Sequence, residues 1–424
     1  MDIIKDLEIR GILKDKTNGI EDFIKNNYIN VYCGTDPTAD SLHVGHIIPI
    51  LTLLRLKKAG IKNVTFLIGG ATGMIGDPSF KNAERTFLEQ DTIKQNTLKI
   101  KNQVEKLFKD NNFDVNIVNN HDWYFKMNVI DFLREGKLLT VNYMSAKESV
   151  KKRITDGMSF TEFSYQLLQG YDFYYLYENF GVNIQIGGAD QWGNITSGID
   201  FIRKKINKEV HAFTIKLLTK SDGSKFGKTE GGCIWLDKTK TSPYEFYQFW
   251  INQSDEEIVN LIKIFSLKDI DYVNSLIEEH LGCPQKHLLQ KNLAEEMTEL
   301  IHGKEEKDKC IKISEIIFGN SNFEEIKNIK DIKDNLKNIE NITISKSELE
   351  DCKTYYDLLS KCCVDMLFSS KSELKRAINN NSVSVNKKKI TSENEEFIKE
   401  EIFSYEFMLV QNGKKKYFVV FFNN

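Results

Sequence analysis

Tyr32-Cys33-Gly34-Thr35-Asp36-Pro37-Thr38-Ala39-Asp40-Ser41-Leu42-His43-Val44-Gly45-His46 is a polar stretch that lies between two apolar segments. Before it, residues 28–31 predict a short strand. After it, residues 47–59 carry Ile and Leu at helical spacing. The order is therefore strand, polar loop, helix. This order places the free N–H groups of a helix start beside the carboxyl end of a strand, where anionic groups bind readily.

His43 and His46 lie at this junction and have two interpretations. In the first they only cap a core helix, which is the usual case for a single histidine. In the second they face a bound phosphate, because Gly45 between them lets a ligand approach the backbone. The residues alone leave these two interpretations about even.

Apolar runs alternate with helical patterns as far as about residue 220. The further strands are predicted at residues 64–68, 114–118, 182–186 and 213–218, and the main helices at residues 91–110, 163–180 and 195–205. Such alternation is typical of an α/β fold with a Rossmann-like, doubly wound and mostly parallel sheet. Ligand loops then gather at the carboxyl ends of the strands.

Two further loops and one neighbouring pair of residues carry candidate ligand groups. Residues 69–79 contain four glycines, which fit either a tight turn or backbone held close to a ligand. Lys81 and Arg85 follow at i, i+4, either as a solvated pair or as cations for a leaving pyrophosphate. Residues 187–194 begin with Gly-Gly and include Asp190, an arrangement that reaches a ribose hydroxyl in α/β sites.

Tyr165, Gln169 and Asp172 recur at i, i+4 and i+7, so a helix places them on one face. That face is either a wet surface or a polar pocket. The flanking Leu167, Leu168 and aromatic residues favour a packed segment, and buried polar groups need partners. A small polar ligand is one such partner.

The loop at residues 221–232 is polar and glycine-rich. It is either a flexible linker or a mobile loop that delivers Lys225 and Lys228 to a polyphosphate.

The remaining chain divides by composition. Five parts are expected: a Rossmann-like domain at 1–220, the loop and linker at 221–242, a helical domain at 243–320, a linker at 321–350, and a small α+β domain at 351–424. The last part carries two lysine runs, which are either solvated turns or a patch for a phosphate backbone.

Composition bounds the partners and the compartment. The chain has 424 residues and a net charge of −3, so contact with nucleic acid must depend on local patches. Seven cysteines without a C-x-x-C pair argue against a disulfide framework or a zinc site and for a reducing compartment. The N-terminal residues read as an amphipathic helix, not a signal peptide, and no bilayer-spanning run is found. A cytoplasmic protein is expected.

The motifs resemble those of class I aminoacyl-tRNA synthetases, specifically the bacterial type of tyrosyl-tRNA synthetase. His43-Val44-Gly45-His46 is similar to the H-I-G-H signature, and residues 32–40 extend the likeness to the tyrosine enzymes. The K-F-G-K-T run at residues 225–229 resembles the K-M-S-K-S loop. Residues 371–378 with the following V-x-V-N resemble a small RNA-binding domain named after a ribosomal small-subunit protein, although the usual preceding glycine is missing.

The resemblance implies roles for individual residues. For tyrosine, it implies Tyr32 and Asp172 on the phenolic hydroxyl, Asp77, Tyr165 and Gln169 on the ammonium group, Gln191 near the carboxylate, and Gln185 nearby. For ATP and the adenylate, it implies Cys33, Gly34, Asp36, Gly45, Gly188, Asp190 and Lys228. For the activation chemistry, it implies Thr38, His43, His46, Lys81, Arg85, Lys225 and Lys228. For RNA, the candidates are Lys375, Arg376, Lys387, Lys388 and Lys389.

The implied activity is tyrosine–tRNA ligation with ATP-Mg²⁺ as co-substrate, tRNA(Tyr) as partner, and no resident metal. The family is homodimeric, and Phe160 with residues 129–139 would supply an apolar contact. Three alternatives are a tryptophanyl-tRNA synthetase, another H-x-G-H nucleotidyl transferase, and a non-catalytic RNA-binding paralogue. ATP–pyrophosphate exchange that depends on tyrosine distinguishes them.

Overall fold

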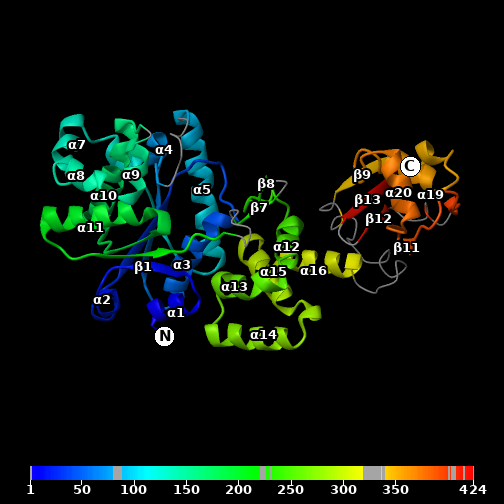
Figure 1. Ribbon diagram of the computed structural model, residues 1–424, viewed down its shortest axis with the longest axis horizontal. Coiled ribbons are helices and arrows are strands. Elements are labelled where there is room, and N and C mark those ends of the chain that lie inside the picture. Colours follow the sequence, from blue (N-terminus) through cyan, green and yellow to red (C-terminus); the bar gives the residue numbers. More distant parts are fainter. Residues whose placement is uncertain are drawn as a thin grey trace. The chain divides into compact units, whose positions relative to one another are not determined.

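The computed structural model of the chain describes residues 2–79, 88–155, 157–219, 226–229, 232–318, 336, 340–399, 402, 407–413 and 416–423. Contacts divide the chain into two compact units (Figure 1). The first consists of Met1–Thr241 and Phe249–Ile301, and the second of Ser242–Gln248 and His302–Asn424. Each unit is described by itself.

A six-stranded sheet forms the centre of the first unit. Its strands are β1 (Leu13–Lys16), β2 (Asn30–Thr35), β3 (Asn63–Ile68), β4 (Asn116–Asn119), β5 (Ile184–Gly188) and β6 (His211–Ile215), in the order β1-β6-β5-β2-β3-β4. The five strands from β6 to β4 are parallel, as the alternating pattern predicts. Strand β1 adds an antiparallel edge. Its sequence, Leu-Lys-Asp-Lys, has no apolar run, so periodicity did not predict it.

Helices flank the sheet on both faces (Figure 1). Helix α3 (Ile47–Lys58) buries nearly all of its Ile and Leu side chains and connects β2 to β3. Helices α10 (Phe160–Phe180) and α11 (Trp192–Ile206) pack together, and Phe173 and Ile202 share a core cluster with Tyr32. The other helices before residue 219 are α1 (Ile3–Ile9), α2 (Ile20–Asn26), α4 (Thr72–Ile75), α5 (Gln90–Asp110), α6 (His121–Tyr124), α7 (Val129–Gly136), α8 (Val141–Ser145) and α9 (Glu148–Thr155).

The strand order reverses between β2 and β5. From β2 the chain runs through α3 to β3 on one side, and from β5 it runs through α11 to β6 on the other. The connections therefore diverge and leave a crevice above the carboxyl ends of these two strands, which is where open α/β sheets bind ligands.

Helices dominate the chain from residue 243 to residue 318, as predicted. They are α12 (Pro243–Ile251), α13 (Asp255–Phe265), α14 (Ile270–Gly282), α15 (Leu288–His302) and α16 (Lys304–Phe318). Helices α13 and α14 belong to the same compact unit as the sheet.

The second unit contains a five-stranded sheet in the order β11-β10-β12-β13-β9, with two helices. Its elements are β9 (Asn341–Ser345), α19 (Tyr355–Cys362), α20 (Lys371–Asn379), β10 (Val383–Val385), β11 (Lys388–Lys389), β12 (Phe407–Asn412) and β13 (Lys416–Asn423). This arrangement agrees with the predicted small α+β domain. Asn381, just before β10, has a φ of +53°, so an asparagine takes the left-handed position at the turn where the resemblance expects a glycine.

Part of the range interpreted as a linker, residues 321–350, is not a linker. Asn341–Ser345 forms β9, which pairs in parallel with β13, and Ile344 joins the core of this sheet. The alternation Asn-Ile-Thr-Ile-Ser is a strand pattern with period two. The surrounding Asn, Lys and Glu residues concealed it. Most of the rest of the range lies outside the described residues.

Candidate active site

A cavity of about 260 Å³ lies at the point where the strand order reverses, and its lining comes from β2, β3, α10, β5 and their loops. The structure brings together there most of the residues that the motifs predicted: Tyr32, Cys33, Gly34, Asp36, Thr38, Gly45, His46, Asp77, Tyr165, Gln169, Asp172, Gln185, Gly188, Asp190 and Gln191. Segments far apart in sequence therefore form one polar pocket.

Asp172, on α10, provides the anionic group at one side of the pocket. Its two carboxylate oxygens accept hydrogen bonds from Trp123 Nε1 at 3.0 Å and from Asn120 Nδ2 at 3.1 Å. Burial raises the pKa of Asp172 to about 7, although hydrogen bonds from Asn120, Tyr124 and Trp123 act in the opposite direction. Two fixed donors thus hold this carboxylate in one orientation.

Tyr32 and Gln185 present polar atoms to the same cavity from neighbouring strands. The Tyr32 side chain is 1% exposed, and its ring lies 5.4 Å from that of Phe173. Its hydroxyl and the Gln185 Oε1 atom are buried and have no hydrogen-bond partner within the described part of the chain. Burying such atoms without a partner is costly, so these groups are suited to a small polar ligand.

A second polar cluster centres on Asp36. Tyr165 donates from its hydroxyl to Asp36 Oδ2 at 2.9 Å, and Thr72 donates to Asp36 Oδ1 at 2.7 Å. Asn120 Nδ2 in turn lies 3.0 Å from the Thr72 hydroxyl. The Asp36 and Asp172 carboxylates are therefore connected through Thr72 and Asn120.

Gln191 links Asp77 and Asp190, which also line the pocket. Its amide Nε2 donates to Asp77 Oδ2 at 2.7 Å and to Asp190 Oδ2 at 3.1 Å. Gly188 lies beneath Asp190 so closely that a Cβ there would be 2.4 Å from Asp190 Oδ1. The Gly-Gly turn thus lets the carboxylate lie over the backbone.

The two histidines form a short turn at the start of α3. Residues Val44–His46 make one turn of 3₁₀ helix. His43 Nδ1 accepts from the Gly45 N–H at 3.0 Å, and the two imidazole rings stack at 3.7 Å. A Cβ on Gly45 would lie 2.8 Å from the His43 ring, so this turn requires glycine. His43 itself does not line the cavity; it supports His46, which does.

The segment after the lysine loop packs directly on this histidine turn. Val44 N donates to Ile234 O at 2.9 Å, and Leu236 N donates to Leu42 O at 2.9 Å. Gly227 has a φ of +82°, and a Cβ on it would lie 3.4 Å from Gly45 N. The K-F-G-K-T and H-x-G-H motifs therefore meet at their glycines.

Four of the predicted cations lie wholly or partly outside the residues that the structure describes. Lys81, Arg85 and Lys225 are outside the described residues. For Lys228 the backbone is described, in β7 (Lys228–Thr229), which pairs with β8 (Gly232–Cys233). The roles of these four cations remain predictions.

The predicted RNA residues lie together in the second unit, on α20 and the β10–β11 hairpin. Lys375 forms an ion pair with Glu393 at 2.9 Å, and Lys388 lies 4.0 Å from Glu395. Both lysines and Lys389 are exposed. Exposed pairs of this kind are weak, so a phosphate can replace the carboxylate.

Asn120, Trp123 and Thr72 contribute to the site and were not predicted. Thr72 lies in the glycine-rich loop that was singled out. Asn120 directly follows β4, and the rule that site residues follow parallel strands would have found it. Trp123 carries no such signal, because its single donor becomes important only through contact with Asp172.

No group of three or more His, Cys, Asp or Glu side chains among the described residues is placed to hold a metal ion. None of the described helices combines the length and the apolar character needed to span a bilayer.

Comparisons with known proteins define the class. Residues 25–319 match the family described as tRNA synthetases class I (W and Y), and residues 331–420 match the tyrosine–tRNA ligase SYY-like C-terminal domain. The chain belongs to the tyrosyl-tRNA synthetase family of class I.

Individual relatives agree along the whole length. The tyrosine–tRNA ligase of Amoebophilus asiaticus is 45% identical, with 99% of each chain covered, and that of Mycoplasma mycoides is 46% identical, with 99% and 98% covered. Among solved structures, a C-terminally truncated mitochondrial tyrosyl-tRNA synthetase of Aspergillus nidulans superposes with a TM-score of 0.68 at 31% identity, covering 75% of this chain and 94% of that one.

Proposed function

We propose that the protein is a tyrosine–tRNA ligase. It activates L-tyrosine with ATP to tyrosyl-adenylate and pyrophosphate, and then transfers tyrosine to the 3′ terminal ribose of tRNA(Tyr). The observation that carries this proposal is one cavity whose lining includes Asp172 and Tyr32 together with Gly45 and His46 of the histidine turn. The names of the full-length relatives support it. ATP–pyrophosphate exchange that requires tyrosine, and that tryptophan does not support, is the test.

The geometry supports the first step without a protein nucleophile. A tyrosine carboxylate oxygen forms a bond to the α-phosphorus of ATP, and the bond from that phosphorus to the pyrophosphate oxygen breaks. Asp172 and Tyr32 hold the phenolic hydroxyl, Asp77, Tyr165 and Gln169 surround the ammonium group, and Gln191 lies near the carboxylate. Catalysis then consists of positioning and of stabilising charge on the phosphates.

The nucleotide half of the cavity has matching groups. Gly188 and Asp190 receive the ribose, with Cys33, Gly34 and Asp36 beside it, and Thr38, Gly45 and His46 face the phosphates. Lys81, Arg85, Lys225 and Lys228 act on the departing pyrophosphate. ATP enters as its Mg²⁺ complex, so that the ion arrives with the substrate.

His46→Ala is expected to lower the rate of tyrosine activation far more than the affinity for tyrosine. The imidazole would donate to a phosphate oxygen whose charge grows in the transition state, and such a bond contributes roughly 1.5–3 kcal/mol, or about 10- to 100-fold in rate. Stopped-flow adenylate formation gives the rate, and calorimetry gives the dissociation constant of tyrosine. Lys228→Ala should behave alike. An equal loss in tyrosine binding would contradict the assignment.

Tyrosine binding is expected to weaken below pH 7. The phenolic hydroxyl donates its proton to the Asp172 carboxylate, so the ionised form binds it. Since burial raises the pKa of Asp172 to about 7, binding is strong above that pH and falls by about tenfold for each pH unit well below it. Titrating tyrosine at several pH values measures this. A dissociation constant independent of pH would contradict it.

A homodimer in the cytoplasm is the proposed form. Helix α7 buries none of its residues, and Val129, Ile130 and Leu133 are at least 55% exposed. Phe160, 72% exposed, lines a neighbouring apolar pocket with Val129 and Phe132. A patch of this kind marks an interface. Sedimentation should give twice the 49.1 kDa mass of one chain, and Phe160→Asp should reduce it. All seven cysteines are free thiols, which suits a reducing compartment.

A further inference from the structure

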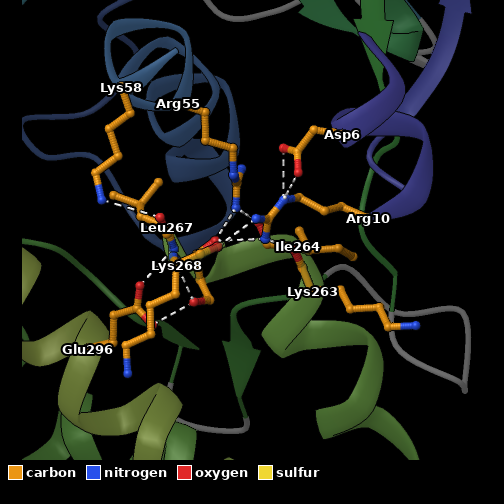
Figure 2. A network of polar contacts seen from close by, with 10 residues as sticks. Asp6, Arg10, Arg55, Lys58, Lys263, Ile264, Leu267, Lys268 and Glu296 are labelled. Atoms are coloured by element: carbon orange, nitrogen blue, oxygen red, sulfur yellow. Dashed lines mark hydrogen bonds and ion pairs between the residues drawn. The ribbon is translucent and has the colours of Figure 1, made fainter. Parts of the chain in front are cut away.

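Two buried arginines grip the end of helix α13 (Figure 2). Arg10 donates from Nη1 to the carbonyl oxygens of Lys263 at 3.0 Å and Ser266 at 3.1 Å, and from Nη2 to Lys268 O at 2.6 Å. Arg55 donates from Nη2 to Ser266 O at 2.8 Å and also to Ile264 O. The carbonyls of Lys263, Ile264 and Ser266 belong to the last turn of α13 and its cap, which lack partners inside the helix, and Lys268 lies two residues beyond the cap.

The two guanidinium groups come from different elements of the nucleotide-binding sheet domain. Arg10 follows α1 and is held by Asp6 through two bonds of 2.9 and 3.0 Å from Nε. Arg55 lies in α3, the helix that begins at the histidine turn. Glu296 completes the network from α15 by accepting from Ser266 Oγ and Leu267 N, both at 2.7 Å. We call Arg10 and Arg55 the arginine clamp.

Burying the two guanidinium groups removes their charges from water, which costs folding free energy. Arg10 and Arg55 are only 5% and 4% exposed. Burial, together with the neighbouring Arg10, lowers the pKa of Arg55 to about 9. Within the described chain, the two α13 carbonyls are the only hydrogen-bond acceptors of Arg55, since its Nε and Nη1 have none. The two arginines satisfy carbonyls that the helix end leaves without partners, and because they come from outside α13, the same bonds fix where α13 ends relative to α1 and α3.

Phe265, which lies between two of the carbonyls bound by the arginines, packs against Phe226 of the K-F-G-K-T motif. Phe265 lies between Ile264 and Ser266, and its ring is 5.5 Å from that of Phe226 and 4.8 Å from that of Trp250. Phe226 is the second residue of the K-F-G-K-T motif, is 5% exposed, and also contacts Phe249 at 5.4 Å. The clamp therefore fixes one wall of the aromatic pocket that holds Phe226.

The same clamp also fixes the histidine turn. Arg55 is nine residues after His46 on one continuous helix, so about 13 Å of rigid α3 separate them. Phe226 is followed by Gly227, which packs on Gly45. The end of α13 thus helps to position both motifs. It contacts α3, which carries the histidine turn, through Arg55, and it contacts Phe226 of the K-F-G-K-T motif through Phe265.

We propose that Arg55, with Arg10, is a positioning residue for tyrosine activation: it holds Phe265, and through Phe265 the Phe226 anchor of the lysine loop, in register with His46. This inference rests on the proposed function. It predicts that losing the clamp impairs the step in which the lysines meet pyrophosphate. Tyrosine binding and transfer to tRNA from preformed adenylate need no such register.

The test compares Arg55→Met, Phe226→Leu and the double variant in the full-length protein. Each single change should lower kcat for tyrosine-dependent ATP–pyrophosphate exchange by roughly 2- to 30-fold, the range for residues that act through others, and leave tyrosine affinity within about twofold. The double variant should lose about as much as the worse single variant, because both changes disable one path. Arg55→Lys should recover part of the rate.

Lys58→Met is the matched control. Lys58 is an exposed cation of the same network that donates to Leu267 O at 3.2 Å, but it does not grip α13 itself. It should leave exchange unchanged. Multiplicative losses in the double variant, an equal effect of Lys58→Met, or a matching loss of tyrosine affinity would each overturn the proposal. If Arg55→Met does not fold by circular dichroism, Arg55→Lys and Phe226→Leu carry the comparison.

Hydrogen exchange provides a readout that does not depend on activity. Amides of residues 226–236 should exchange faster in Arg55→Met than in the wild type and in Lys58→Met; equal exchange in all three would refute the clamp. If the wild type showed no tyrosine-dependent ATP–pyrophosphate exchange, the proposed function would be refuted instead. The two failures are therefore distinguishable.

Discussion

Asp172→Asn is expected to lower kcat/KM for tyrosine in ATP–pyrophosphate exchange by roughly 10²- to 10³-fold, because removing a buried charged acceptor costs several kcal/mol. Trp123 Nε1 and Asn120 Nδ2 both donate to this side chain. An asparagine has one acceptor oxygen and one NH₂ group in place of two carboxylate oxygens, so at least one of these donors loses its acceptor. Phenylalanine has no hydroxyl, and its activation should change much less.

The comparison of both amino acids makes the experiment specific. Tyr32→Phe should cost less, about tenfold, because it removes one neutral hydroxyl. Asp122→Asn is the matched control: Asp122 is an exposed carboxylate on α6 beside Trp123. It should leave both substrates unaffected. If Asp172→Asn keeps the preference for tyrosine over phenylalanine, the pocket is oriented differently from the proposal.

Deleting residues 340–424 is expected to leave adenylate formation within about threefold of wild type and to reduce tRNA charging at least a hundredfold, through loss of contacts to the phosphate backbone. The cut precedes β9, because this strand belongs to the C-terminal sheet. Pyrophosphate exchange and charging of tRNA measure the two steps. Normal charging by the truncated chain would show that this domain is not an RNA module.

Charge reversal tests the same surface without a deletion. Lys388→Glu with Lys389→Glu changes two exposed positions of β11 and should weaken charging in a manner that depends on salt. Lys346→Glu, in the segment after β9, is a control that reverses the charge of a single lysine in the same domain. Its charging should remain close to that of the wild type.

The parallel sheet could be predicted because each of its strands carries apolar residues and alternates along the chain with a helical pattern. The helices α3, α5, α10 and α11 followed from their periodicity, with ends displaced by a few residues at most. Strands β1 and β9 could not be found in this way. The first is too short and charged, and the second is stabilised by pairing with β13, a contact between segments distant in sequence.

The site was predicted as a set of residues more fully than as a set of contacts. Loops after strands and one polar helix face identified most residues that line the cavity. The hydrogen bonds between these residues were not predicted. Tyr165, for example, was expected near an ammonium group, but its hydroxyl donates to Asp36. The arginine clamp gave no sequence signal at all, since Arg10, Arg55 and Ser266 meet only in the folded chain.

The supports of Asp172 have a practical consequence for redesign. Asn120 and Trp123 reach this carboxylate from the β4–α6 segment, whereas the histidine turn and the lysine segment lean on α3 and α13. The proposed tyrosine pocket and the proposed phosphate site therefore take their main supports from different elements. Because Tyr165 and Asn120 also belong to the network around Asp36, a library over β4, α6 and α10 that keeps these two residues should vary the amino-acid side with the least change on the ATP side.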